Sequence, residues 1–171
     1  MTSRDAPRLK TVRQRHGPAA EPAAHVLRQF RQIFNAVKTH FQQVERKAGL
    51  GGAQIWALSV VRDTPDIGIS DLSRAMDIHQ STASNLVKAL VARELVAVGK
   101  GSNDRRAVQL RLLPAGAKAL KRSPGPYAGV LPAAIGTLDD KTLKRLQQDL
   151  AKLIEALNAD DAAGGIPLAE L

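Results

Sequence analysis

A run of polar side chains with helical spacing lies near the middle of the sequence. The run consists of Gln80, Ser81, Thr82, Ser84, Asn85 and Lys88. Amide and hydroxyl groups can hydrogen-bond the edges of DNA bases, an Asn can pair with adenine through two bonds, and a Lys ammonium suits a phosphate. The alternative is a helix side that meets only water, but such a side usually alternates acidic and basic residues. The short hydrogen-bonding side chains therefore favour contact with nucleic acid.

A second group of charged residues follows, at the tip of an expected β-hairpin. The runs 95–98 and 107–112 are β-prone, and the glycine-containing segment 99–106 joins them. The charged residues considered at this tip are Lys100, Asp104, Arg105 and Arg106. Arginines at a hairpin tip suit the narrow minor groove, where the negative potential is highest. A solvated charged turn is the alternative. No phosphate-binding fingerprint surrounds the Gly-Lys-Gly-Ser stretch, so we interpret it as a turn.

The polar run belongs to the second of two expected helices. In the helix over 80–93, the inward residues are Ala83, Leu86, Val87, Leu90 and Val91. A shorter helix precedes it, with Ser70 as its cap and as a further candidate for DNA contact. Its inward residues are Leu72, Ala75 and Met76. Residues 77–79 separate the two helices. Two short helices with a tight turn, followed by a hairpin, are typical of a winged helix-turn-helix.

The segment 69–116 resembles the DNA-binding region of the MarR-type winged-helix repressors. Residues 104–116, Asp-Arg-Arg-Ala-Val-Gln-Leu-Arg-Leu-Leu-Pro-Ala-Gly, look like the wing signature of that family. Residues 69–76 and 80–84 resemble its helix-turn-helix, and a looser likeness covers residues 25–158. The resemblance implies a mainly α fold with a small β-hairpin wing and a helical dimerisation base.

The resemblance also implies roles for the residues of the wing. In the family, the position of Arg106 reaches the minor groove and that of Asp104 orients it, while Arg105 is expected to touch phosphate. Members bind small, often aromatic acids between the dimer base and the winged lobe, and no residue here identifies such an effector. The sequence departs from the family pattern at three positions. Leu113 replaces a capping Thr, Glu94 replaces a helix-ending Gly, and Lys88 replaces an acidic residue that holds the wing arginine.

The remaining chain is expected to form helices around this region. Residues 1–24 are interpreted as a flexible basic arm, either without a role or in contact with DNA. Residues 25–52 hold a long helix from His25 to Ala48, which glycines end. Residues 53–113 form the DNA-binding region, with a helix over 53–62 at its start. In 114–158, helices are expected at 114–122, 127–135 and 139–157, and residues 159–171 are expected to form a loose tail.

Apolar seams near both ends of the chain predict a homodimer. In the first helix the seam consists of Val26, Phe30, Ile33 and Val37. In the last helix it consists of Leu143, Leu146, Leu150, Leu153 and Leu157. The second set has alternating spacings of three and four residues, which is a heptad pattern. The alternative is that these seams only close the core of a monomer.

Composition excludes several classes of protein and favours a polyanionic partner. The chain has 171 residues, a net charge of +9 and no cysteine, and its isoelectric point is near 10.4. A thiol site is therefore excluded, and the four scattered histidines indicate no metal site. We expect no cofactor. No apolar run approaches the ~20 residues that a membrane span requires, so a cytoplasmic protein is expected.

These observations predict a transcriptional regulator that is not an enzyme. It would bind a pseudo-palindromic operator in double-stranded DNA as a homodimer, act as a repressor and respond to a small-molecule effector. A regulator without an effector is the alternative on the last point. The alternative function is an architectural or sequence-tolerant DNA-binding protein. An enzyme would need a reactive constellation, and the sequence offers none.

Overall fold

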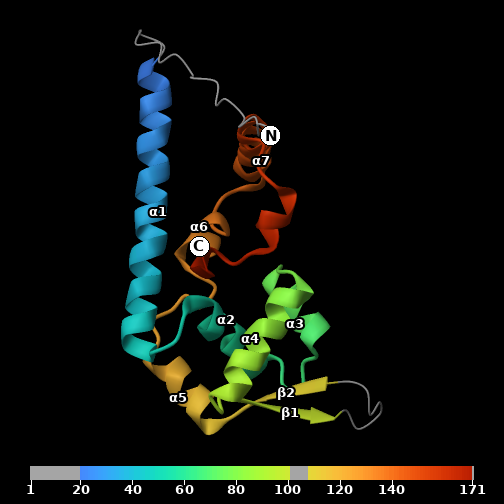
Figure 1. Cartoon of the computed structure of the whole chain (residues 1–171). Helices are drawn as coiled ribbons and strands as arrows, with labels where there is room; N and C mark the ends of the chain where they lie inside the picture. Colours follow the sequence, from blue (N-terminus) through green and yellow to red (C-terminus); the bar gives the residue numbers. More distant parts are fainter. Residues whose placement is uncertain (1–19, 101–107, 171) are drawn as a thin grey trace, which may run out of the picture. The chain divides into compact units, whose positions relative to one another are not determined.

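The chain is mainly helical, with one antiparallel β-hairpin (Figure 1). The computed structural model describes residues 20–100 and 108–170. The elements in chain order are α1 (Ala20–Ala48), α2 (Gly52–Asp63), α3 (Ile69–Met76), α4 (Gln80–Ala92), β1 (Val96–Lys100), β2 (Val108–Leu112), α5 (Pro114–Arg122), α6 (Val130–Ile135), α7 (Asp140–Leu157), η1 (Asp161–Gly165) and η2 (Leu168–Glu170). The chain divides into two units, one ending at Phe34 and one beginning at Asn35.

Helix α1 begins at Ala20, five residues before the expected start at His25. An acidic residue and a proline lie in its first turn, where both are favourable, and alanines follow them. The predicted flexible arm 1–24 was therefore wrong for residues 20–24, and residues 1–19 lie outside the described part of the chain. The helix ends where Gly49 takes the left-handed conformation, with φ of 70°.

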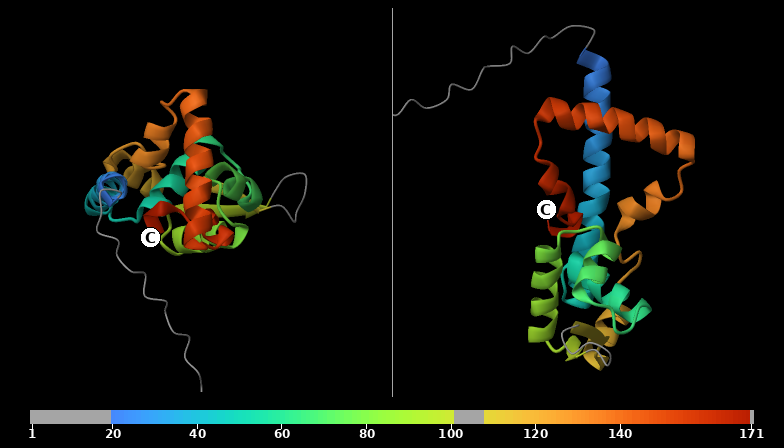
Figure 2. Two further views of the ribbon diagram at one scale, coloured as in Figure 1. Left: turned by 90° about the horizontal axis from the view of Figure 1, so that it is seen from above. Right: turned by 90° about the vertical axis from the view of Figure 1, so that its right-hand side faces the viewer.

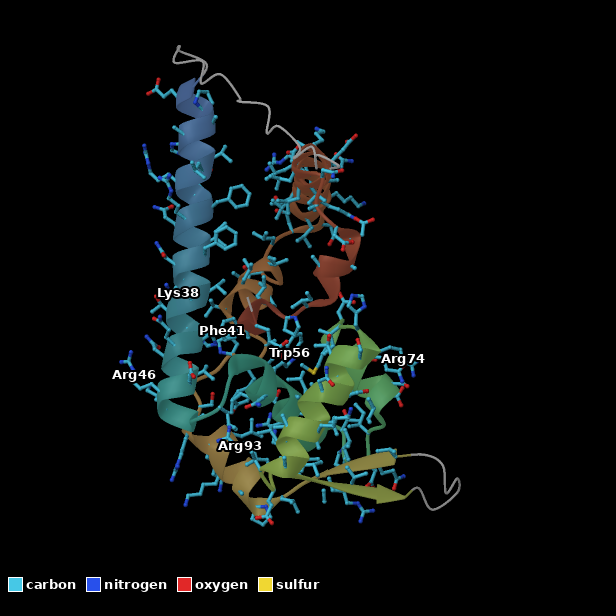
Figure 3. The ribbon with its side chains drawn as sticks, viewed as in Figure 1. Lys38, Phe41, Arg46, Trp56, Arg74 and Arg93 are labelled. Carbon is cyan, nitrogen blue, oxygen red and sulfur yellow. The ribbon has the colours of Figure 1, made fainter. Side chains whose placement is uncertain are left out.

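The core of the second unit joins α2, α3, α4 and the hairpin. Its most completely buried side chains are Ile55, Leu58, Leu72, Met76, Leu90 and Leu110. Trp56 is partly buried and packs against the edge of this core (Figure 3). Ala75 is exposed, contrary to the prediction, and Ser73 takes the inward position of its turn. The Ser73 hydroxyl is satisfied there because it donates to the Ser70 carbonyl at 2.8 Å.

Strands β1 and β2 form the predicted hairpin. Val96 pairs with Leu112, Val98 with Leu110, and Lys100 with Val108. A single β-bridge joins Ile67 to Leu110, so the chain before α3 runs along the outer edge of β2. This bridge fixes the hairpin to the loop that begins the helix-turn-helix. Residues 101–107 at the tip lie outside the described residues.

The helices after the hairpin follow the sequence closely, with one difference. Helix α5 has its predicted bounds, and α6 begins at Val130 rather than near Tyr127. The Tyr127 ring instead packs against the core, with the Arg62 guanidinium 5.2 Å from its centroid. Asp139 caps α7, because its carboxylate accepts the Thr142 amide at 2.9 Å. That bond lowers the pKa of Asp139. None of the helices in the described ranges is long and apolar enough to cross a membrane.

The predicted loose tail was wrong. Residues 159–170 form η1 and η2 and return to the lobe. Pro167 is buried, and Ala169 packs against the core. The sequence shows no periodicity here because short 3₁₀ turns bury single residues rather than a stripe.

Candidate nucleic-acid interface

The first helix of the interface is set by backbone geometry rather than by the expected side-chain cap. Gly68 occupies the cap position of α3, and Ser70 lies inside the first turn. The predicted capping role of Ser70 was therefore wrong. Its hydroxyl instead accepts a hydrogen bond from the side-chain amide of Gln80, with 3.2 Å between Nε2 and Oγ. This bond links the exposed beginnings of α3 and α4.

A short turn then places α4. Asp77 ends α3 in the left-handed conformation, with φ of 51°. The amide of Ile78 donates to the Ser73 carbonyl at 3.0 Å, which closes the end of α3. His79 occupies the cap position of α4, and its carbonyl accepts the Ala83 amide at 3.0 Å. The predicted pair of helices with a tight turn is confirmed.

Helix α4 turns an apolar side inward and a polar side outward. The buried residues are Ala83, Leu86, Val87 and Leu90. Of the predicted contact residues, Gln80, Ser81, Asn85 and Lys88 are exposed, while Thr82 and Ser84 are half-buried. The first turn contains no acidic residue. The helix dipole and the free amides of this turn therefore favour an anion such as phosphate.

A groove of about 540 Å³ lies between α4 and the hairpin. Val87 and Val91 line it from α4, Val98 and Val108 from the strands, and Lys88 and Ser84 complete its α4 side. Val91 was predicted to face the core, but it is 38% exposed because it belongs to this groove. The groove gives the interface an apolar strip beside the polar face, which suits thymine methyl groups and sugars.

The base of the wing is held by an ion pair that the sequence did not predict. The Arg111 guanidinium on β2 donates to the Asp66 carboxylate at 2.6 Å. This hydrogen bond raises the pKa of Arg111, which stays charged throughout the accessible pH range. The Asp66 amide also donates to the Leu110 carbonyl at 3.1 Å. The hairpin is thus fixed to the loop before α3 by side chain and backbone together.

Asp104, Arg105 and Arg106 lie outside the described residues, and Lys100 is placed only by its backbone at the end of β1. Of the remaining cations near the helix-turn-helix, Arg74 pairs with Asp71, and Arg93 donates to the Gly49 carbonyl at 3.0 Å. Figure 3 labels both of these arginines. Lys88 is the exposed cation that projects from the polar side of α4.

The predicted dimer seams differ in exposure. On α7, Leu146, Leu150 and Leu153 are each more than a third exposed, and Leu157 is 68% exposed, while Leu143 is half-buried. On α1, Val26 and Ile33 are exposed and Phe30 is half-buried. Val37 is buried within its own chain, so its predicted place on an open seam was wrong. The leucine face of α7 does not close the core of the second unit.

Part of the chain matches a family profile and a curated repressor. Residues 48–107 match the sequence profile of the MarR family. The transcriptional repressor NicR of Pseudomonas putida is 33% identical over 100 residues, and the match spans 58% of this chain and 61% of the length of that relative.

Two solved structures are similar in fold. The YusO protein of Bacillus subtilis has 17% identity and a TM-score of 0.50, over 82% of this chain and 99% of that one. A MarR family protein of Bacillus stearothermophilus has 20% identity and a TM-score of 0.50, over 81% and 97% of the two chains. At such identities the likeness concerns the fold. It confirms the expectation of a mainly helical protein with a two-stranded wing.

Proposed function

Because residues 48–107 match the MarR family, we propose that the chain is a member of that family and a transcriptional regulator that binds a specific sequence in double-stranded DNA through α4. The observation that carries the proposal is the exposed polar face of α4 beside an anchored hairpin. Asn85 and Lys88 project from that face, and the groove with Val91 adjoins it. A helix of this kind fits the major groove while a wing reaches the adjacent minor groove. Arg106 would supply the minor-groove contact.

The proposed active form is a homodimer. The leucine face of α7 is an exposed row of apolar side chains, and the N-terminal part of α1 offers a second one. Contiguous exposed apolar surface often marks a protein–protein interface. A twofold axis would place two copies of α4 on half-sites about one DNA turn apart. The preferred operator would therefore be an imperfect palindrome.

The proposed mode of control is repression that a small acid relieves. The relative NicR is a repressor, and the family resemblance implies effectors that are small acids. Occupation of a promoter would block transcription. An effector would act by favouring a dimer whose two α4 helices are spaced wrongly for DNA.

The experiment that tests this proposal is a footprint of the protein on the DNA beside its own coding region. We expect protection of a palindrome, and we expect excess scrambled duplex to compete poorly. An architectural protein is the second candidate, because a charge of +9 alone gives sequence-independent affinity. Equal competition by scrambled and specific duplex would support that candidate and contradict regulation.

A further inference from the structure

The C-terminal segment 159–170 contacts His79, the cap residue that precedes the recognition helix α4. Figure 2 shows this segment beside the start of α4. The His79 amide donates to the Gly165 carbonyl at 3.2 Å. The His79 ring also hydrogen-bonds this segment, with Nε2 2.7 Å from the Ala162 carbonyl oxygen. A carbonyl can only accept, so Nε2 carries the proton in this contact. One residue is therefore held by the segment through both its backbone and its side chain.

His79 makes fewer hydrogen bonds to α4 than to the C-terminal segment. Its side chain makes no capping bond to the helix. Its amide precedes the helical ladder, and only its carbonyl enters that ladder by accepting the Ala83 amide. Outside the helix-turn-helix, the groups that hold His79 in place are therefore the Gly165 and Ala162 carbonyls of the C-terminal segment.

Gly165 makes this close contact geometrically feasible. A Cβ atom built at this position would lie 2.5 Å from His79 Nε2, so the His79 ring must move if residue 165 carries a side chain. The same atom built at Gly164 would have nothing within 4 Å. Two adjacent glycines of one 3₁₀ turn therefore differ in whether a methyl group is tolerated. They provide a matched pair of substitutions.

The far end of the segment is anchored at the beginning of α2. Pro167 is buried, and Ala169 packs so close to Gly52 that a Cβ on this glycine would lie 2.9 Å from the Ala169 Cβ. Phe41 of α1 lies against the same glycine. The segment thus spans from the turn before α4 to the junction of α1 and α2.

The near end of the segment is joined directly to α7. Asn158 ends α7 in the left-handed conformation, and Asp160 caps η1 by accepting the Ala162 amide at 3.0 Å. Only Ala159 and Asp160 separate Asn158 from η1. This short, hydrogen-bonded connection links the position of η1 to that of α7.

We infer that segment 159–170 is a brace that positions α4 through His79 and couples α7 to the helix-turn-helix. The inference rests on the proposed function, because its consequence is read as DNA affinity. When the brace is docked, α4 begins at a fixed place relative to α2. When it is undocked, the turn at 77–79 can rotate, and α4 must be ordered again on DNA. His79 is a positioning residue that needs no contact with DNA.

The test compares Gly165→Ala with Gly164→Ala in the full chain. Two readouts are needed: hydrogen exchange of the His79 amide without DNA, and affinity for the footprinted duplex at fixed salt. We expect Gly165→Ala to speed exchange at least about tenfold and to weaken DNA binding about fivefold or more. Gly164→Ala should match the wild type in both. His79→Ala should weaken DNA binding similarly, and His79→Gln should restore most of the affinity because its amide can still donate to Ala162.

Three outcomes would count against the brace. Unchanged exchange in Gly165→Ala would show that the contact between the His79 ring and the segment does not hold the segment docked. Faster exchange with wild-type affinity would show docking without positioning of α4. Equal loss in His79→Ala and His79→Gln would contradict the role of the ring bond. Wild-type protein without sequence preference would contradict the proposed function alone, because exchange of the His79 amide reports docking independently of DNA.

Discussion

Side chains on the polar face of α4 divide into those that can read a base and those that can hold a phosphate. Asn85 is exposed, and its amide can donate and accept at once, which is what adenine presents in the major groove. Lys88 is exposed one turn further along, and an ammonium on a long stem gives charge without directional readout. Adjacent turns of one helix should therefore contribute in measurably different ways.

Asn85→Ala should relax base preference at one symmetric pair of operator positions, at a cost of about 1–3 kcal/mol at the preferred base. Lys88→Ala should weaken binding to all duplexes alike and reduce the salt dependence by about one phosphate per subunit. A library of single-base operator variants, measured at two salt concentrations, separates the two effects. If Lys88→Ala changes base preference and Asn85→Ala does not, the reading face of α4 is assigned wrongly.

Glu94 has a backbone conformation that residues with a side chain rarely adopt. Its φ is 54°, in the left-handed region where a Cβ atom is strained. Glu94→Gly should therefore raise the free energy of unfolding by roughly 0.5–1 kcal/mol, after allowance for the greater freedom of glycine in the unfolded chain. Urea unfolding at fixed protein concentration measures this. Ala89→Gly, inside α4, is the control and should lower stability. A loss of stability in Glu94→Gly would contradict the assigned strain.

At the scale of elements, sequence periodicity predicted the helices that have a continuous apolar side. The helices with a continuous apolar side have their expected bounds to within about two residues at most ends, as the α4 and α5 ends illustrate. The start of α1 was missed because alanines and a first-turn proline carry no periodic signal. The tail was missed because its contacts are made by backbone carbonyls and by single buried residues, neither of which gives a periodic pattern.

The same reasoning explains which parts of the site were predicted. The polar side of α4 is a pattern along one helix, so the sequence contains it. The groove beside Val91 and the pair between Asp66 and Arg111 join residues far apart in the chain. Val91 has the same apolar character whether it meets the core or a groove, so its type cannot decide between them. Only the position of β1 and β2 against α4 does so.

Helix α7 provides the element-scale prediction for the dimer. Leu150→Glu places a carboxylate in the proposed seam, where a buried unpaired charge is costly. We expect the protein to become monomeric by sedimentation at micromolar concentration while α7 keeps its helicity. Gln148→Glu adds the same charge on the opposite side of the helix and should leave the dimer intact. A dimer that persists in Leu150→Glu would rule out this face of α7 as the interface.

At the scale of the whole molecule, the proposed function depends on two surfaces, the polar face of α4 and the leucine face of α7. A single chain cannot use both of them fully. The polar face of α4 covers a few base pairs, and a site so short is common in any genome. The leucine face of α7 would double the number of bases read by pairing two chains. Specificity in the dimer then depends on the spacing between two copies of α4, which is also the quantity that an effector would change.

Selection of bound duplexes from a random library, with the full chain at physiological salt, tests the central claim most directly. The account predicts enrichment of one imperfect palindrome whose half-sites are centred about one helical turn apart. It further predicts two chains per duplex when the selected complex is sized by sedimentation. Enrichment of a single unrepeated site, or of no sequence at all, would contradict it.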